Sequence, residues 1–356
     1  MDTSDFFMKS TNTIILIGGI HLNHKPTCGE TMKNQLFLKR FNELFEHVIP
    51  IDTYEWKKHP LFIFKLFFTL ISHPKAKVII SGSRASRFLI YFLYYFPINR
   101  NAYFWVVGGD LHIGIEKGLY NVHALNKLVF IPVQGKSMVQ QLSQLGVHNA
   151  IYVPNSKPIT YHPTLVNHPC EKPFRFVFVS RIHPDKGIKE IYEASLMLNS
   201  AGLKSKYYID FYGSIDPNYV NEFNDLLSQN QSLKYKGYLD FTTNAGYKQL
   251  STYDIMLFPT YWQGEGFPGV VIDANIAGVP IIASDWNLNR EVIEDNKTGF
   301  IIPAHDSLAL LESMKKVIKN DIDLFSMKKN CNDYIQQYDY RNVLSIELMK
   351  KLKLYE

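Results

Sequence analysis

The sequence has few cysteines and no long apolar segment. Cys28, Cys170 and Cys331 lie far apart in a chain of 356 residues and have neither disulfide nor metal-ligand spacing, which fits a reducing compartment. The longest apolar runs fall far short of the roughly 20 residues that a membrane-spanning helix needs. The N-terminus, MDTSDFFMKSTNT, places acids before any basic residue and has no apolar core, so we expect no secretory signal and a cytoplasmic location.

The first strand and its loop lack the marks of two common sites. The strand Thr13–Ile17 runs into Gly18-Gly19 without the GxGxxG dinucleotide fingerprint. His21 and His24 have no third ligand spaced nearby, which favours ordinary loop histidines over a metal pair. Gly29 leaves two interpretations open: it lets the backbone approach a ligand phosphate, or it only marks a loop.

Charge is uneven along the chain. Residues 1–155 hold 16 Lys+Arg and 9 Asp+Glu, a balance of +7, whereas the remainder holds 22 and 24, a balance of −2. A basic N-terminal half suits an anionic partner such as a membrane surface or a diphosphate lipid. Nucleic acid is not expected as a partner, because the basic residues are dispersed and no binding motif is present.

Strands and helices alternate, which predicts an α/β protein of two Rossmann-like domains with parallel sheets. We expect domains at 1–155 and 174–335, joined by a linker at 156–173 that is rich in Pro, Asn, His and Thr, and a C-terminal helix at 336–356. Further strands are expected at 48–51, 77–80, 102–107, 128–132, 150–153, 174–180, 207–213, 233–239, 254–258 and 279–283.

Two aromatic-rich runs, Leu61–Ile71 and Phe88–Phe96, leave two interpretations open. Aromatic stripes at helical spacing are usually core, which favours packing inside the domain. Alternatively, both helices dip into one membrane leaflet beside the basic residues around them. Those basic residues are Lys57, Lys58, Lys65, Lys75, Lys77, Arg84 and Arg87.

Residues 258–286 form a strand, glycine-rich loop, helix and strand in succession. The loop contains Glu265, and Asp273 follows eight positions later in a helix made otherwise of apolar residues. Backbone poor in side chains at a helix N-terminus binds phosphate or sugar oxygens. A carboxylate in so apolar a helix is costly unless it is paired, although both acids also suit the helix dipole without any ligand.

Two other strand ends carry candidate ligand groups. FRFVFVS leads into Arg181, Lys186 and a helix, so two cations and helix N–H groups can clamp a diphosphate; solvated loop charges are the alternative. Asp110 and His112 follow Gly108-Gly109 at the end of a strand, where open α/β sheets place ligand residues.

The acid pair around GFPG and the segment ANIAGVPIIAS resemble the donor-sugar signature of retaining GT-B glycosyltransferases, most closely glycosyltransferase family 4. That family usually has Glu where this chain has Asp273. The resemblance implies two domains facing across a cleft and transfer of a sugar, with retained configuration, from a nucleotide diphosphate sugar, a UDP-sugar being favoured. It implies an acceptor for that sugar. The basic, aromatic N-terminal half and the expected lack of an export signal suggest the hypothesis that this acceptor is a glycan linked through diphosphate to a lipid, in surface polysaccharide synthesis at the inner face of the cell membrane.

The resemblance also assigns roles to residues. Glu265 would hold the sugar, Asp273 the ribose hydroxyls, and Asp110 or His112 would face the sugar from the first domain. The implied donor-binding residues are Arg181, Lys186, Gly266, Phe267, Pro268, Gly269, Asp273, Gly29 and Gly237.

The sequence also indicates whether a metal is needed, and the resemblance leaves other functions open. The single DxD, Asp321 and Asp323, lies between helical stretches rather than after a strand, so we expect Asp321 to be a helix N-cap and the enzyme to need no metal or other cofactor. Two other functions share the fold: a sugar-nucleotide 2-epimerase or hydrolase, and a non-catalytic partner subunit.

Overall fold

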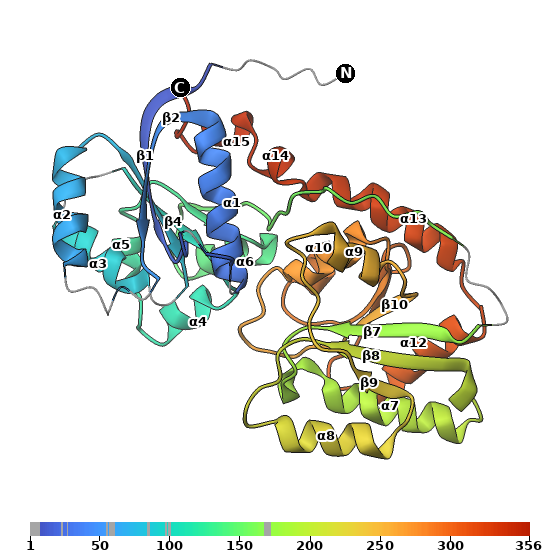
Figure 1. The fold of residues 1–356 in the computed structure, drawn as a ribbon. Helices are drawn as coiled ribbons and strands as arrows, with labels where there is room; N and C mark the ends of the chain where they lie inside the picture. The colour runs from blue at the N-terminus through green and yellow to red at the C-terminus, as the bar shows by residue number, and fades with distance from the viewer. Residues whose placement is uncertain are drawn as a thin grey trace. The chain divides into compact units, whose positions relative to one another are not determined.

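The computed structural model describes residues 8–22, 24–26, 28–54, 56, 61–83, 86–96, 98, 101–166 and 172–356. The chain divides into two compact units, each a parallel α/β layer structure (Figure 1). The first unit contains the chain up to Lys157 together with Tyr338–Glu356, and the second contains Pro158–Gln337.

The sheet of the first unit has the order β2-β1-β3-β4. Its strands read as continuous β-branched and aromatic runs, because helices cover both faces of a parallel sheet. A separate parallel pair, β5–β6, continues beside β4, where Phe104 N donates to Phe130 O. The strands are β1 Ser10–Gly18, β2 Phe45–Asp52, β3 Lys77–Gly82, β4 Ala102–Val106, β5 Ile131–Val133 and β6 Ala150–Tyr152.

The helices of the first unit lie on the two faces of this sheet. Figure 1 shows α1 on one face and α2 with α3 on the other. The C-terminal segment packs on the α1 face, where Tyr103 donates a buried 2.9 Å hydrogen bond to Leu352 O. The helices are α1 Gly29–Leu44, α2 Phe62–Ser72, α3 Arg87–Tyr95, α4 Leu111–Glu116, α5 Val122–Leu125, α6 Lys136–Gln144, α14 Tyr340–Val343 and α15 Ile346–Lys351.

The sheet of the second unit is six-stranded and parallel, in the order β12-β11-β10-β7-β8-β9. This order places β7 beside β10, so the loops that leave these two strands share one edge of the sheet. The strands are β7 Phe174–Val179, β8 Tyr207–Tyr212, β9 Leu233–Tyr235, β10 Ile255–Phe258, β11 Ile281–Ser284 and β12 Gly299–Ile302.

One buried cluster joins the sheet of the second unit to α7 and α12. Phe176 and Phe178 of β7 alternate with residues on the other face of the strand, and Ile191 and Leu198 of α7 pack against them. The helices are α7 Ile188–Ser200, α8 Val220–Gln229, α9 Asn244–Leu250, α10 Gly269–Ile276, α11 Asn289–Val292, α12 Ser307–Ile318 and α13 Leu324–Ile335, with 3-10 turns at Pro184–Lys186, Lys204–Lys206 and Gln336–Tyr338.

The structure corrects three local predictions. The strand expected at 128–132 begins at Ile131, and the one expected at 233–239 ends at Tyr235. The N-cap of α13 is Asp323, not Asp321: its carboxylate accepts from Ser326 N at 2.9 Å. Two acids in KNDIDLF fit a cap equally well by sequence, and the start of the helix at Leu324 decides between them.

Within the predicted linker, the described residues from Pro158 to Val166 contain no helix or strand, and they belong to the second unit. The predicted positions Lys57, Lys58, Arg84 and Cys170 lie outside the residues that the structure describes. Within the described part of the chain, no helix is both long and apolar enough to cross a membrane.

Candidate functional site

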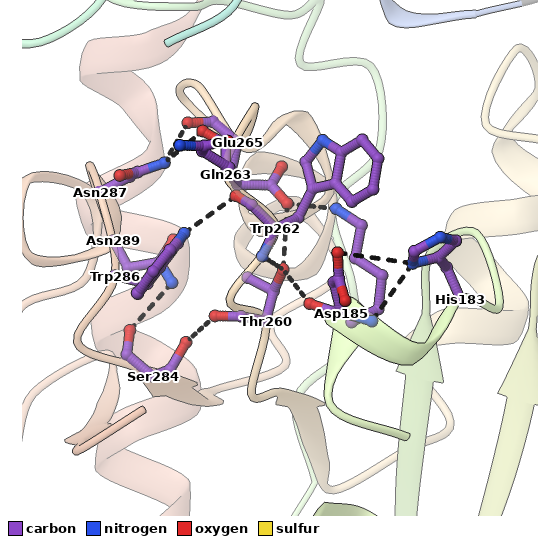
Figure 2. A network of polar contacts seen from close by, with 11 residues as sticks. His183, Asp185, Thr260, Trp262, Gln263, Glu265, Ser284, Trp286, Asn287 and Asn289 are labelled. Carbon is purple, nitrogen blue, oxygen red and sulfur yellow. Dashed lines mark hydrogen bonds and ion pairs between the residues drawn. The ribbon is translucent and has the colours of Figure 1, made fainter. Parts of the chain in front are cut away.

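The carboxyl edge of the second sheet brings three loops together. They leave β7, β10 and β11, which are adjacent or nearly adjacent in the sheet order. In an open parallel sheet, this edge is where ligands bind. Figure 2 shows polar side chains from all three loops linked in one network.

The β7–α7 loop is pressed against the start of the β10–α10 loop. A 3-10 turn, Pro184–Lys186, ends at Gly187, whose φ of +78° is left-handed. A Cβ on Gly187 would lie 2.3 Å from Pro259 O, so only glycine permits this close approach. The packing aims Lys186, whose backbone is in this turn, toward the acidic loop.

Lys186 and Glu265 form an ion pair in which both side chains are nearly buried, at 9% and 14% exposure. Lys186 Nζ donates to Glu265 Oε2, and Thr260 Oγ1 donates to the same oxygen at 3.3 Å. Removal of either charge would leave the other charge nearly buried and without its partner. The ion pair therefore couples the two loops strongly.

Two cations of the site, Arg181 and Lys186, lie close to the ring of Trp262. The Arg181 guanidinium lies 4.7 Å from the Trp262 ring centroid, and Lys186 Nζ lies 5.8 Å from it. The His183 ring contacts the same indole edge to face at 5.0 Å. Cations above an aromatic face are attracted to its negative quadrupole, so Arg181 is oriented although it is exposed.

Hydrogen bonds from the β11–α11 segment hold the backbone of the acidic loop (Figure 2). Ser284 Oγ donates to Thr260 O, and Trp286 Nε1 donates to Trp262 O at 2.9 Å. Asn287 Nδ2 donates to Glu265 O at 2.9 Å. These protein contacts hold the loop in shape, which is the arrangement expected of a preorganised site.

Asp273 is in α10, about one turn after the helix begins at Gly269, and is 2% exposed. Tyr247 donates to Asp273 Oδ1 at 2.9 Å; burial and the nearby carboxylate both raise the pKa of Tyr247, so it stays protonated. This hydrogen bond offsets part of the free-energy cost of burying a carboxylate in an apolar helix. At the N-terminus of α10, Phe267 is buried, Pro268 is the cap residue and Gly269 begins the helix.

Gly237 lies just after β9 with a left-handed φ of +85°. Its carbonyl accepts from Gly213 N at 2.8 Å, which fixes the backbone where β8 and β9 end. A Cβ at Gly237 would meet open space, so the left-handed turn rather than crowding explains this glycine.

Asp110, His112 and Gly29 belong to the first unit. Asp110 is the residue before α4, following Gly108 with φ +105°. His112 Nδ1 is buried and has no hydrogen-bond partner among the described residues. Gly29 opens α1 with open space around its Cα. The structure thus brings Arg181, Lys186 and Glu265 together in the second unit. Asp110, His112 and Gly29 lie in the first unit.

Several residues of the site carry no signal in the sequence. Trp262, Thr260 and Asn287 contact groups that are far away in the chain, and no local pattern marks them. Glu30, in the first turn of α1, is a further candidate: burial raises its carboxyl pKa, although a hydrogen bond with Ser83 acts in the opposite direction. Within the described residues, no three His, Cys, Asp or Glu side chains are grouped to hold a metal ion.

Solved structures with similar folds cover nearly the whole chain. Sucrose-phosphate synthase from Thermosynechococcus elongatus aligns over 96% of this chain and 98% of its own, with a TM-score of 0.72 and 15% identity. The Anabaena protein HepE, solved with UDP-glucose, aligns over 96% and 98% with a TM-score of 0.67 and 13% identity. Residues 166–338 match the family model described as "Glycosyl transferases group 1". The chain has the GT-B fold and resembles glycosyltransferase family 4.

Curated relatives of this GT-B chain align over shorter stretches. The phosphatidyl-myo-inositol mannosyltransferase of Mycobacterium leprae is 31% identical over 87 residues, which is 24% of this chain and 23% of that protein. The capsular polysaccharide biosynthesis glycosyltransferase CapM of Staphylococcus aureus is 27% identical over 146 residues, 40% and 36% of the two chains. The matches thus span less than half the length of these relatives.

Proposed function

We propose that this protein is a retaining glycosyltransferase that moves a sugar from a nucleotide diphosphate sugar to a glycan acceptor. The observation that carries the proposal is the meeting of Lys186 and Glu265, beside Arg181, at the carboxyl edge of the second sheet. A diphosphate needs cations and a sugar needs a hydrogen-bonding acid, and the site offers both side by side.

Sugar transfer requires the site to stabilise the negative charge that develops on the leaving group. As the glycosidic bond breaks, the diphosphate gains negative charge, which Arg181, Lys186 and the backbone N–H groups of Gly266, Phe267 and Gly269 would stabilise. An ammonium group has three donors, so Lys186 can hold Glu265 and a diphosphate oxygen together. Glu265 would then hold the hydroxyls of the sugar and the positive face of its ring.

The remaining donor contacts are assigned by resemblance and geometry together. Asp273 would bind the ribose hydroxyls, with Tyr247 orienting its carboxylate. The turn at Gly237 would lie against the base, and Asp110 or His112 would face the sugar from the first unit. A UDP-sugar is the favoured donor, which the UDP-glucose bound to the similarly folded HepE supports. No metal is part of the proposal, so a chelator should leave the rate unchanged.

The acceptor is proposed to be a glycan, linked through diphosphate to a lipid, in surface polysaccharide synthesis. Support comes from CapM and from an Escherichia coli relative, 25% identical over 162 residues, which acts as "UDP-Gal:alpha-D-GlcNAc-diphosphoundecaprenol alpha-1,3-galactosyltransferase". The matched stretch is 46% of this chain and 41% of that protein. Such an acceptor places the reaction at the inner face of the cell membrane, with peripheral contact through the basic N-terminal half.

Measuring UDP release from UDP-sugars with and without a lipid-diphosphate-linked glycan tests this proposal. We expect release that depends on the acceptor and is lost in Glu265→Ala, with product NMR showing the donor's anomeric configuration. Equal release without an acceptor would instead indicate the epimerase or hydrolase class. No release from any nucleotide sugar, together with no donor binding, would indicate the non-catalytic subunit.

A further inference from the structure

The first unit exposes apolar side chains where a protein normally covers them. Of 17 large apolar residues exposed in the described chain, 10 lie between Tyr54 and Phe96. Scattered apolar residues on a surface are ordinary, but a concentration of this kind marks a contact site. We call it the α2–α3 surface, and it includes Ile63, Phe64, Phe67 and Phe68 of α2, with Phe88 and Phe96 at the two ends of α3.

Both helices are apolar on two opposite faces. In α2, Phe62, Leu66 and Leu70 repeat every four residues and are buried toward the sheet. The opposite face carries Phe64 and Phe68, which are 61% and 62% exposed. A helix that is apolar all round is normally enclosed on every side, so the outer face of α2 calls for a second apolar environment.

Trp56 packs between the starts of the two helices. Its ring lies 5.8 Å from that of Phe62, at the start of α2, and stacks at 6.0 Å on that of Phe88, at the start of α3. From there a row of rings continues along α3 through Phe92 to Phe96, with centroids 6.3 and 5.4 Å apart. These ring contacts link the start of α2, through its buried Phe62, to the exposed Phe88 and Phe96 of the α3 segment.

Charge indicates what covers this surface. Between Trp56 and Gly109 the sequence has eight Lys and Arg and no Asp or Glu. Lys65, Lys75 and Arg87 are exposed on or beside the two helices. A second copy of the chain bound through the same patch would place cations against cations, since a two-fold interface pairs a surface with itself. A surface that is both apolar and free of acids matches an anionic lipid leaflet instead.

The length of α2 limits how it can meet the lipid. Eleven residues at about 1.5 Å each give a helix of roughly 16 Å, half of the ~30 Å hydrocarbon core. The helix therefore lies along the interface, with its apolar face in the acyl boundary and its cations at the headgroups.

We infer that the α2–α3 surface docks this protein onto the surface of an anionic membrane, with Phe64, Phe68 and Phe88 in the acyl boundary. The inference locates the membrane contact of the proposed function on particular residues. It stands on apolar exposure and charge, and it does not depend on the chemistry of the second unit.

Vesicle flotation of the full chain, without any donor, tests the inference. We expect binding at least tenfold tighter to phosphatidylcholine vesicles containing phosphatidylglycerol than to phosphatidylcholine alone. Phe64→Ser with Phe68→Ser should weaken binding to both at least tenfold. The matched control is Phe325→Ser, which removes an exposed phenylalanine from α13 in the other unit and should change nothing.

Two charge-reversal variants test the electrostatic contribution to membrane binding. Arg87→Glu should reduce the preference for phosphatidylglycerol, whereas Lys350→Glu, the same reversal of charge at an exposed position of α15, should not. Absence of vesicle binding by the wild type, or unchanged binding by the double serine variant, would overturn the inference. A solution dimer that the double variant abolishes would also overturn it. Donor binding, measured on the same samples, tells this failure from a failure of the proposed function.

Discussion

Removing Lys186 should destabilise the second unit even without a ligand. Lys186→Ala leaves the Glu265 carboxylate nearly buried, with the Thr260 hydroxyl at 3.3 Å as the remaining partner of Oε2 in the network described above. Breaking a buried pair from one side typically costs about 3–5 kcal/mol, and the residual 14% exposure of Glu265 argues for the lower end, about 3 kcal/mol. At about 3 °C per kcal/mol for a unit of this size, the melting temperature should fall by roughly 9 °C.

Thermal and urea unfolding of ligand-free protein give the measurement. Lys189→Ala is the matched control, because Lys189 is 71% exposed one turn away and faces Glu193 at 3.8 Å; its loss should be within about 0.5 kcal/mol. In Lys186→Met with Glu265→Gln neither charge remains, so the double variant should recover about 2 kcal/mol of the loss. A loss below about 1 kcal/mol in Lys186→Ala, or additive losses in the double variant, would refute the coupling of the two loops.

Three further changes test other parts of the structure. Asp254→Ala leaves Lys328 buried without its 3.2 Å carboxylate partner, and urea unfolding should show a loss of about 3–5 kcal/mol, whereas a loss under about 1 kcal/mol would deny the pair any structural role. Gly187→Ala puts a Cβ against Pro259 O in a left-handed conformation, so stability should fall by at least about 2 kcal/mol and donor affinity with it; wild-type behaviour would contradict the close approach. Burial acts to raise the pKa of Asp52, but backbone N–H donors outweigh it and lower the pKa. The free energy of unfolding of the wild type should therefore exceed that of Asp52→Asn by about 1 kcal/mol above pH ~4. This difference should disappear as the pH falls through the lowered pKa of Asp52 in the folded protein, and a difference that does not change with pH would refute the reasoning.

Much of the site was predictable because its key residues follow strand ends. Arg181 and Lys186 leave one strand and Glu265 leaves another, and carboxyl ends of parallel strands share an edge. The sequence could not show that β7 and β10 are neighbours, which is what brings Lys186 against Glu265. Support from Ser284 and Asn287 was missed because it depends on the same long-range arrangement.

Other differences have local causes. The sequence places Asp110 and His112 after Gly108-Gly109 at a strand end and predicts no helix there, yet α4 begins at Leu111, since a glycine before a helix does not prevent it. The apolar runs at 61–71 and 88–96 could not be assigned to core or surface, because periodicity shows which residues share a face but not what covers it. The structure shows that the core prediction holds for one face of each helix, and that the other is exposed.

The donor site itself is tested most directly by isothermal titration of a panel of nucleotide sugars into wild type, Lys186→Ala and Lys189→Ala. The account predicts that a nucleotide diphosphate sugar, with UDP-sugars first, binds the wild type and Lys189→Ala equally and binds Lys186→Ala at least tenfold more weakly, because a charge-assisted contact to the diphosphate is lost. No binding of any nucleotide sugar to the wild type, or equal binding to Lys186→Ala, would contradict it.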